Sequence, residues 1–96
     1  MDIKQDLCYL TEQTGVSGDE HAASLAALEL LRKYAPNAVV DPFGNVTAVI
    51  ESGRAGAKTL LLDAHIDQIG MIVTYIDNGG FIKVGACGGL DMRTML

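Results

Sequence analysis

The sequence has little positive charge and lacks any long apolar stretch. Of its 96 residues 7 are Lys or Arg and 12 are Asp or Glu, which gives a formal net charge of −5. Binding to a nucleic-acid backbone requires clustered cationic side chains, so we expect no nucleic-acid partner. No apolar run reaches the roughly 20 residues that a membrane-spanning helix needs, so we expect no membrane association.

Signals for export and for a disulfide framework are also missing. The amino terminus, MDIKQDL, has no basic region followed by an apolar core, so we expect a cytoplasmic protein. The two cysteines, Cys8 and Cys87, lie far apart along the chain. Thiols of intracellular proteins usually stay reduced, so we predict that both are structural thiols rather than disulfide or zinc-binding residues.

The composition is that of a folded protein. Apolar residues make up 49% of the chain and charged residues 20%, and 96 residues suffice for one small domain or for part of a larger one. Apolar side chains recur at helical spacing from Ile3 to Leu10, and Gly15 suits a helix end. These features predict a helix over residues 2–14.

A second helix is predicted after residue 17. Ser17 and Glu20 have the spacing of a capping box, in which each side chain satisfies a backbone donor at a helix start. Apolar residues then recur on one face as far as Leu31, and the helix is expected to end before Pro36. Helix capping accounts for Ser17, so we expect no catalytic role for it.

The pattern changes to that of strands after residue 38. Five segments have strand-like composition: 39–40, 46–50, 59–62, 70–76 and 81–84. The continuous apolar run at 59–62 is typical of a central strand that is covered on both faces. Turns are expected at 41–45 and 77–80, and in the glycine-rich segment 85–89. Two helices followed by strands predict an α/β fold with a parallel or mixed sheet.

The segment LLLDAHIDQIGMIV, residues 60–73, places His65 and Asp67 between apolar runs. Burying a polar group without a partner costs roughly 2–7 kcal/mol, so both side chains need a partner or a use. His65 follows the carboxyl end of a predicted strand, where ligand sites of α/β sheets lie, and residues two apart on an extended segment point to the same side. The spacing fits a metal ligand, His65, oriented by Asp67, and it also fits a core histidine bonded to an aspartate.

Four motifs taken together resemble the start of the M42 metallo-aminopeptidases, the family of glutamyl aminopeptidase and the tetrahedral aminopeptidases. They are Gly15-x-Ser17-Gly18-x-Glu20, Asp41-x-x-Gly44-Asn45, the segment 60–73 and Gly88-Gly89-x-Asp91. The resemblance implies that residues 1–69 are the amino-terminal part of a zinc-peptidase-like α/β catalytic domain. Residues 70–96 would then be the incomplete start of the β-domain that is inserted in this family.

The resemblance also implies a chemistry. His65 would bind one of two divalent metal ions, most often zinc or cobalt, and Asp67 would be the catalytic residue that orients it. A metal-activated water would release amino-terminal residues from peptide substrates, with a glutamate as general base. Gln68 departs from the family, which commonly has Glu there. Full-length relatives form homo-oligomers, from dimers to dodecamers.

The remaining ligands and the base follow the inserted domain in this family. A catalytic zinc site needs about three protein ligands, so the 96 residues alone are predicted to be inactive. The alternative is a self-contained, non-catalytic module that assembles or interacts with a related peptidase. Glycoside hydrolysis, which has been ascribed to the family, needs two carboxylates flanking the scissile bond, and the sequence offers no such assigned pair.

Overall fold

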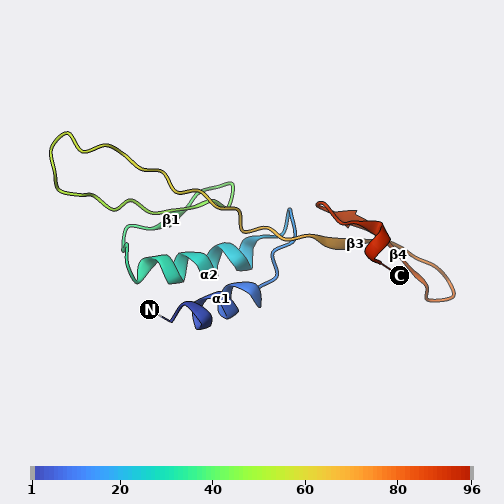
Figure 1. Cartoon of the computed structure of the whole chain (residues 1–96). Helices are drawn as coiled ribbons and strands as arrows, with labels where there is room; N and C mark the ends of the chain where they lie inside the picture. The colour runs from blue at the N-terminus through green and yellow to red at the C-terminus, as the bar shows by residue number, and fades with distance from the viewer. Residues whose placement is uncertain (1, 96) are drawn as a thin grey trace.

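The computed structural model describes residues 2–95, and its elements follow the predicted order of two helices before the strands (Figure 1). The first helix, α1, spans Ile3–Thr11, and the carboxylate of Asp2 accepts a hydrogen bond from its first turn. It ends at Thr11 rather than at residue 14. The side-chain amide of Gln13 donates to the carbonyl of Tyr9 at 2.8 Å, so it satisfies a carbonyl that a longer helix would have bonded itself.

The second helix, α2, spans His21–Arg32 and lies alongside α1, and it ends before Pro36 as predicted. Its start differs from the predicted capping box. The carboxylate of Glu20 accepts a hydrogen bond of 2.6 Å from the backbone N–H of Gly18, but the hydroxyl of Ser17 donates to Asp67. The capping prediction is wrong for Ser17, because a charged acceptor from a distant part of the chain takes its hydroxyl.

A short hairpin packs on α2. Its strands, β1 (Val39–Val40) and β2 (Val46–Thr47), pair antiparallel, and β2 ends before the predicted residue 50. The hydroxyl of Ser24 in α2 donates to the carbonyl of Gly44 in the hairpin turn at 2.8 Å. The buried residues within the described range 2–95 are all small: Gly15, Ala23, Ser24, Ala26, Ala35 and Ala38. The core therefore lies between α2 and this hairpin and is narrow.

The turn between β1 and β2 is organised by the carboxylate of Asp41. It accepts hydrogen bonds from the backbone N–H groups of Phe43 (2.8 Å) and Asn45 (3.0 Å) and from the side-chain amide of Asn45 (2.8 Å). Gly44 has a φ of 87°, a conformation that favours glycine. The second motif of the sequence is therefore a structural turn in this chain.

Residues 48–67 contain no helix or strand (Figure 1). The prediction of a buried central strand at 59–62 is wrong for this chain, because Leu60, Leu61 and Leu62 are 80–84% exposed. A central strand requires hydrogen-bonded neighbours and cover on both faces, and residues 2–95 supply neither at this segment. Apolar composition indicates that a segment suits burial, but it does not supply the strands that would bury it.

The second hairpin consists of β3 (Gly70–Ile76) and β4 (Ile82–Cys87), which pair antiparallel. The carboxylate of Asp77 holds the connecting turn by accepting hydrogen bonds from two backbone N–H groups. β3 has its predicted bounds. β4 continues through residues 85–87, which were predicted to be a turn, because their backbone pairs with the start of β3. The domain boundary between residues 69 and 70 stays a prediction.

The two hairpins form two separate antiparallel sheets within residues 2–95, not the single parallel or mixed sheet that was predicted. The molecule measures 66 × 26 × 26 Å, and its radius of gyration is 18.2 Å. A compact chain of this length has a radius of gyration of about 13 Å. The helices and strands remain compatible with an α/β fold, but the β3–β4 hairpin and the extended segment project from the helical part (Figure 1).

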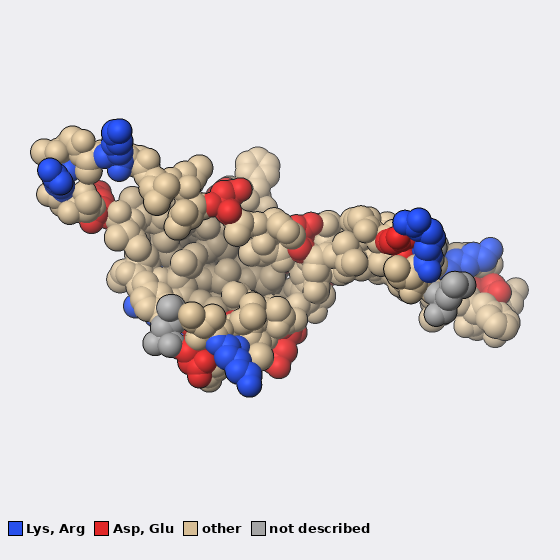
Figure 2. All heavy atoms as spheres, viewed as in Figure 1, with Lys and Arg blue, Asp and Glu red and all other residues tan. Residues whose placement is uncertain are grey.

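Figure 2 shows the Lys and Arg side chains of one face in separate places, over the tip of the extended loop, beside the helices and over the second hairpin. Asp and Glu side chains lie between these places and beside them. Neither of the α-helices in residues 2–95 is long and apolar enough to cross a membrane.

Candidate functional site

Two segments that are far apart in the sequence meet around Asp67. The backbone N–H of Gln68 donates to the carbonyl of Gly15 at 2.7 Å, and Val16 pairs with Gln68 in an isolated parallel bridge. Residues 15–17, between the two helices, therefore run beside the residues that lead into β3. This pairing brings Ser17 next to Asp67.

Ser17, Asp67 and His65 form a continuous chain of hydrogen bonds. The hydroxyl of Ser17 donates to Oδ2 of Asp67 at 2.5 Å. Nδ1 of His65 lies 2.9 Å from Oδ1 of Asp67 and 3.0 Å from its backbone carbonyl oxygen. Both of these oxygens can only accept, so Nδ1 carries the proton and donates it. The carboxylate of Asp67 thus lies between the hydroxyl and the imidazole.

The charge of Asp67 is stabilised by this arrangement. The hydrogen bond from Ser17 and, second, that from His65 lower the pKa of Asp67 below its ordinary value of 3.8. Asp67 is therefore a carboxylate at neutral pH. Because Asp67 accepts a hydrogen bond from the Nδ1–H group of His65, it selects the tautomer in which Nε2 has a free lone pair.

The imidazole of His65 is open to its surroundings. Its side chain is 85% exposed, so the alternative of a buried core histidine does not describe this chain. The ring borders two hollows, one of about 240 Å³ beside the end of α1 and one of about 850 Å³ between residues 41–48 and 61–67. Nε2, the nitrogen that does not contact Asp67, is therefore accessible.

The donor set around His65 fits one metal ligand and not a complete metal site. A protonated Nδ1 held by a carboxylate and an accessible Nε2 are the usual arrangement of a metal-binding histidine. Residues 2–95 contain no group of three or more His, Cys, Asp or Glu side chains placed to hold a metal ion. A metal at His65 would need further ligands that the described part of the chain does not bring together.

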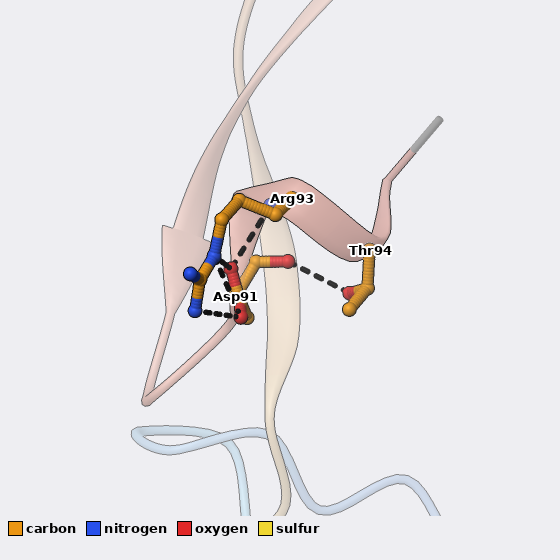
Figure 3. Close-up of polar contacts among 3 residues, drawn as sticks. All are labelled: Asp91, Arg93 and Thr94. Atoms are coloured by element: carbon orange, nitrogen blue, oxygen red, sulfur yellow. Dashed lines mark hydrogen bonds and ion pairs between the residues drawn. The ribbon is translucent and has the colours of Figure 1, made fainter.

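The glycine-rich motif that ends at Asp91 has a local role. Figure 3 shows Asp91 with its partners Arg93 and Thr94 at the short 3-10 helix η1 (Met92–Thr94). The guanidinium of Arg93 contacts both oxygens of the Asp91 carboxylate, at 2.8–3.2 Å, and the hydroxyl of Thr94 donates to the Asp91 carbonyl at 2.7 Å. The ion pair with Arg93 lowers the pKa of Asp91. The polar groups of Asp91 are thus bonded to residues that follow it within three positions.

Ser17 is the site residue that the sequence did not reveal. A serine three residues before a glutamate fits the capping-box pattern even when its hydroxyl contacts another group. The pattern therefore gave no sign of the contact with Asp67. The one sequence signal was its place in the first motif of the family resemblance. His65 and Asp67 were singled out from their spacing, and their roles stay predictions.

Comparison with known proteins gives the family. The sequence profile of the M42 glutamyl aminopeptidase family matches residues 44–96, more than half of the chain. The matched part includes His65, Asp67 and the β3–β4 hairpin. No solved structure shows a significant match to the chain.

Curated relatives agree with the profile. A protein of Acetivibrio thermocellus whose name assigns it to the aminopeptidases is 40% identical over 80% of this chain and 22% of its own length. The lysyl aminopeptidase of Pyrococcus furiosus is 32% identical over 91% of this chain and 25% of its own length. The SgcX protein of Escherichia coli K12, also assigned by name to the aminopeptidases, is 31% identical over 97% of this chain and 25% of its own length.

The chain spans about a quarter of the length of these relatives. Both the profile match and the order of the motifs place it in one group of peptidases. The chain belongs to the M42 glutamyl aminopeptidase family.

Proposed function

We propose that the chain is the amino-terminal part of a metal-dependent aminopeptidase that releases amino-terminal residues from peptides. Family membership and the names of the relatives support a peptidase. The observation that supports metal dependence is the contact of 2.9 Å between Nδ1 of His65 and Oδ1 of Asp67. This contact leaves Nε2 accessible. An imidazole held in this way is prepared to bind a metal ion.

In this proposal His65 is a ligand of one of two divalent metal ions, zinc or cobalt, and Asp67 is the residue that orients it. When bound, such ions activate a water for attack on a peptide carbonyl. Asp67 keeps the proton on Nδ1, holds the plane of the ring and increases the basicity of Nε2 through the charge of its carboxylate. Its lowered pKa means that it retains this charge at neutral pH.

The 96 residues alone are proposed to be inactive. Within residues 2–95 His65 is the one candidate ligand in the site, and a catalytic metal ion needs about three protein ligands and an open position. The other ligands and the base would belong to a longer protein, which we propose acts on peptide substrates in the cytoplasm as a homo-oligomer. The relatives are about four times as long as the segment that they match, which supports a longer protein.

The test compares the 96-residue chain with the longer protein that carries it. Release of the amino-terminal residue is measured on free peptides and on the same peptides with an acetylated amino terminus, with and without a chelator. We expect the longer protein to cleave only the free peptides, to lose activity with chelator and to regain it with Zn²⁺ or Co²⁺. The 96-residue chain should release nothing under the same conditions.

Two results would contradict the proposal. If the longer protein stays active with chelator, its activity does not depend on a metal ion. If the 96-residue chain shows chelator-sensitive activity, it needs no further ligands. If the longer protein is inactive but the 96-residue chain stimulates a related full-length peptidase, the non-catalytic module is the correct account.

A further inference from the structure

Ser17 donates its hydroxyl proton to Oδ2 of Asp67, the carboxylate oxygen that does not face His65. We propose that Ser17 is a positioning residue that fixes the Asp67 carboxylate, so that Asp67 holds the His65 imidazole in one tautomer and one orientation. The inference rests on the proposed function for its link to a metal ion. The contacts that carry it involve only side chains of this chain.

The backbone around Ser17 is itself fixed. On its amino-terminal side, Gly15 accepts a hydrogen bond of 2.7 Å from the backbone N–H of Gln68, and Val16 is bridged to the same residue. The carbonyl of Ser17 accepts a contact of 3.8 Å from Sγ of Cys87 at the end of β4. The hydroxyl is therefore presented to Asp67 from a backbone that is held by both the 65–70 segment and the second hairpin.

The hydrogen bond from Ser17 matters for the geometry of Asp67 because Asp67 and His65 are both exposed to solvent. The side chain of Asp67 is 41% exposed and that of His65 is 85% exposed. An exposed pair of this kind competes with water, and its geometry is weakly determined when nothing else holds it. The hydroxyl of Ser17 occupies one carboxylate oxygen, and the other then faces Nδ1.

Neither capping nor nucleophilic catalysis explains Ser17. The N-cap of α2 is Glu20, and no side chain caps the first turn of this helix. In a nucleophilic triad the imidazole lies between the hydroxyl and the carboxylate, so that it can take the hydroxyl proton. Here the carboxylate lies between the other two groups, and its lowered pKa makes Asp67 a weak base for the hydroxyl of Ser17.

The experiment reads the tautomer of His65 in the 96-residue chain without metal. The chain has two histidines, and His21, exposed in the first turn of α2, is an internal reference. Nitrogen-15 NMR above about pH 8, where an ordinary imidazole is neutral, distinguishes a protonated Nδ1 from a protonated Nε2. We expect His65 to have a protonated Nδ1 and His21 to show a mixture of tautomers.

Three variants separate the hydroxyl of Ser17 from other effects. In Ser17→Ala the nitrogen shifts of His65 should move toward the mixture shown by His21, and in Ser17→Thr, which keeps a hydroxyl, they should stay near those of the unchanged chain. Ser52→Ala removes an exposed hydroxyl in the loop and should change neither histidine. In the longer protein, Ser17→Ala should weaken Zn²⁺ binding by about tenfold, at the lower end of losses for partners of metal ligands.

Three outcomes would overturn the inference. The first is a His65 tautomer that does not change in Ser17→Ala. The second is a His65 in the unchanged chain that resembles His21. The third is loss of amide protection at Gln68 in Ser17→Ala, which would make the effect one of folding. A selected tautomer with no Zn²⁺ binding at His65 in the longer protein would contradict the proposed function and leave the role of Ser17 standing.

Discussion

Gly70 lies directly against the side chain of Val16. A Cβ added to Gly70 would come 2.5 Å from Cγ2 of Val16, 3.2 Å from Cγ1 and 3.5 Å from Cβ. Because both methyl groups and the Cβ are close, rotation of the valine side chain cannot clear the space. This close approach lies next to the pairing of residues 15–17 with residues 66–68, which brings Ser17 beside Asp67.

We predict that Gly70→Ala destabilises this contact. Overpacking at a tight site costs about 1–3 kcal/mol, and here the backbone of β3 or of residue 16 must move to accept the methyl group. The free energy of unfolding and the hydrogen exchange of the Gln68 amide report the effect. Gly89→Ala is the matched control, since a Cβ there would meet nothing within 4 Å. Equal stability of the two variants would contradict the prediction.

The hydrogen bonds of Asp41 predict that the stability of its turn depends on pH. The hydrogen bond from the Asn45 side chain, with further backbone hydrogen bonds, lowers the pKa of Asp41 below 3.8. A carboxyl group with a pKa lowered in the folded state stabilises that state above its unfolded pKa. This contribution is lost as the pH falls through the folded pKa. We therefore expect the turn to loosen only in acid below the ordinary range of aspartate.

The prediction is checked by following the carboxyl carbon of Asp41 and the amide of Phe43 by NMR from pH 6 to pH 2. Asn45→Ala removes the largest cause of the shift, so it should raise the pKa of Asp41 toward its ordinary value and move the loss of the turn to higher pH. An Asp41 that titrates at or above 3.8 in the unchanged chain would contradict the account.

The exposed leucines predict self-association. Leu60, Leu61 and Leu62 are 80–84% exposed on a backbone that belongs to neither sheet, and such a segment offers both apolar surface and strand-pairing groups. Sedimentation velocity over a range of concentrations should show association of the 96-residue chain. Leu61→Lys should reduce it, and Glu51→Lys, a charge change at another exposed position, should not. A monomer at every concentration would contradict this prediction.

Features that depend on neighbours in sequence were predicted well. The end of α2 before Pro36 and the turn at Asp77 result from interactions within a few residues, and β3 pairs with β4, the next strand along the chain. The apolar run at 59–62 and the hydroxyl of Ser17 were assigned wrongly. Their structure depends on distant partners, which are absent for the leucines within residues 2–95 and present for Ser17 in the form of Asp67.

The candidate site was predictable in part for the same reason. His65 and Asp67 are two residues apart, so an extended backbone is enough to bring their side chains together. The third member, Ser17, joins them only because residues 15–17 pair with residues 66–68. The spacing of polar residues in one segment does not encode that pairing.

The central claim is that His65 is a metal ligand oriented by Asp67, and the metal content of the longer protein tests it most directly. Bound zinc and cobalt per chain are measured after dialysis, together with the rate of peptide hydrolysis. We predict that His65→Ala loses metal at one of two sites and abolishes activity. Asp67→Asn should weaken binding by about 10–100-fold, and His21→Ala, the control, should change neither quantity. Unchanged metal content and an unchanged rate in His65→Ala would contradict the account.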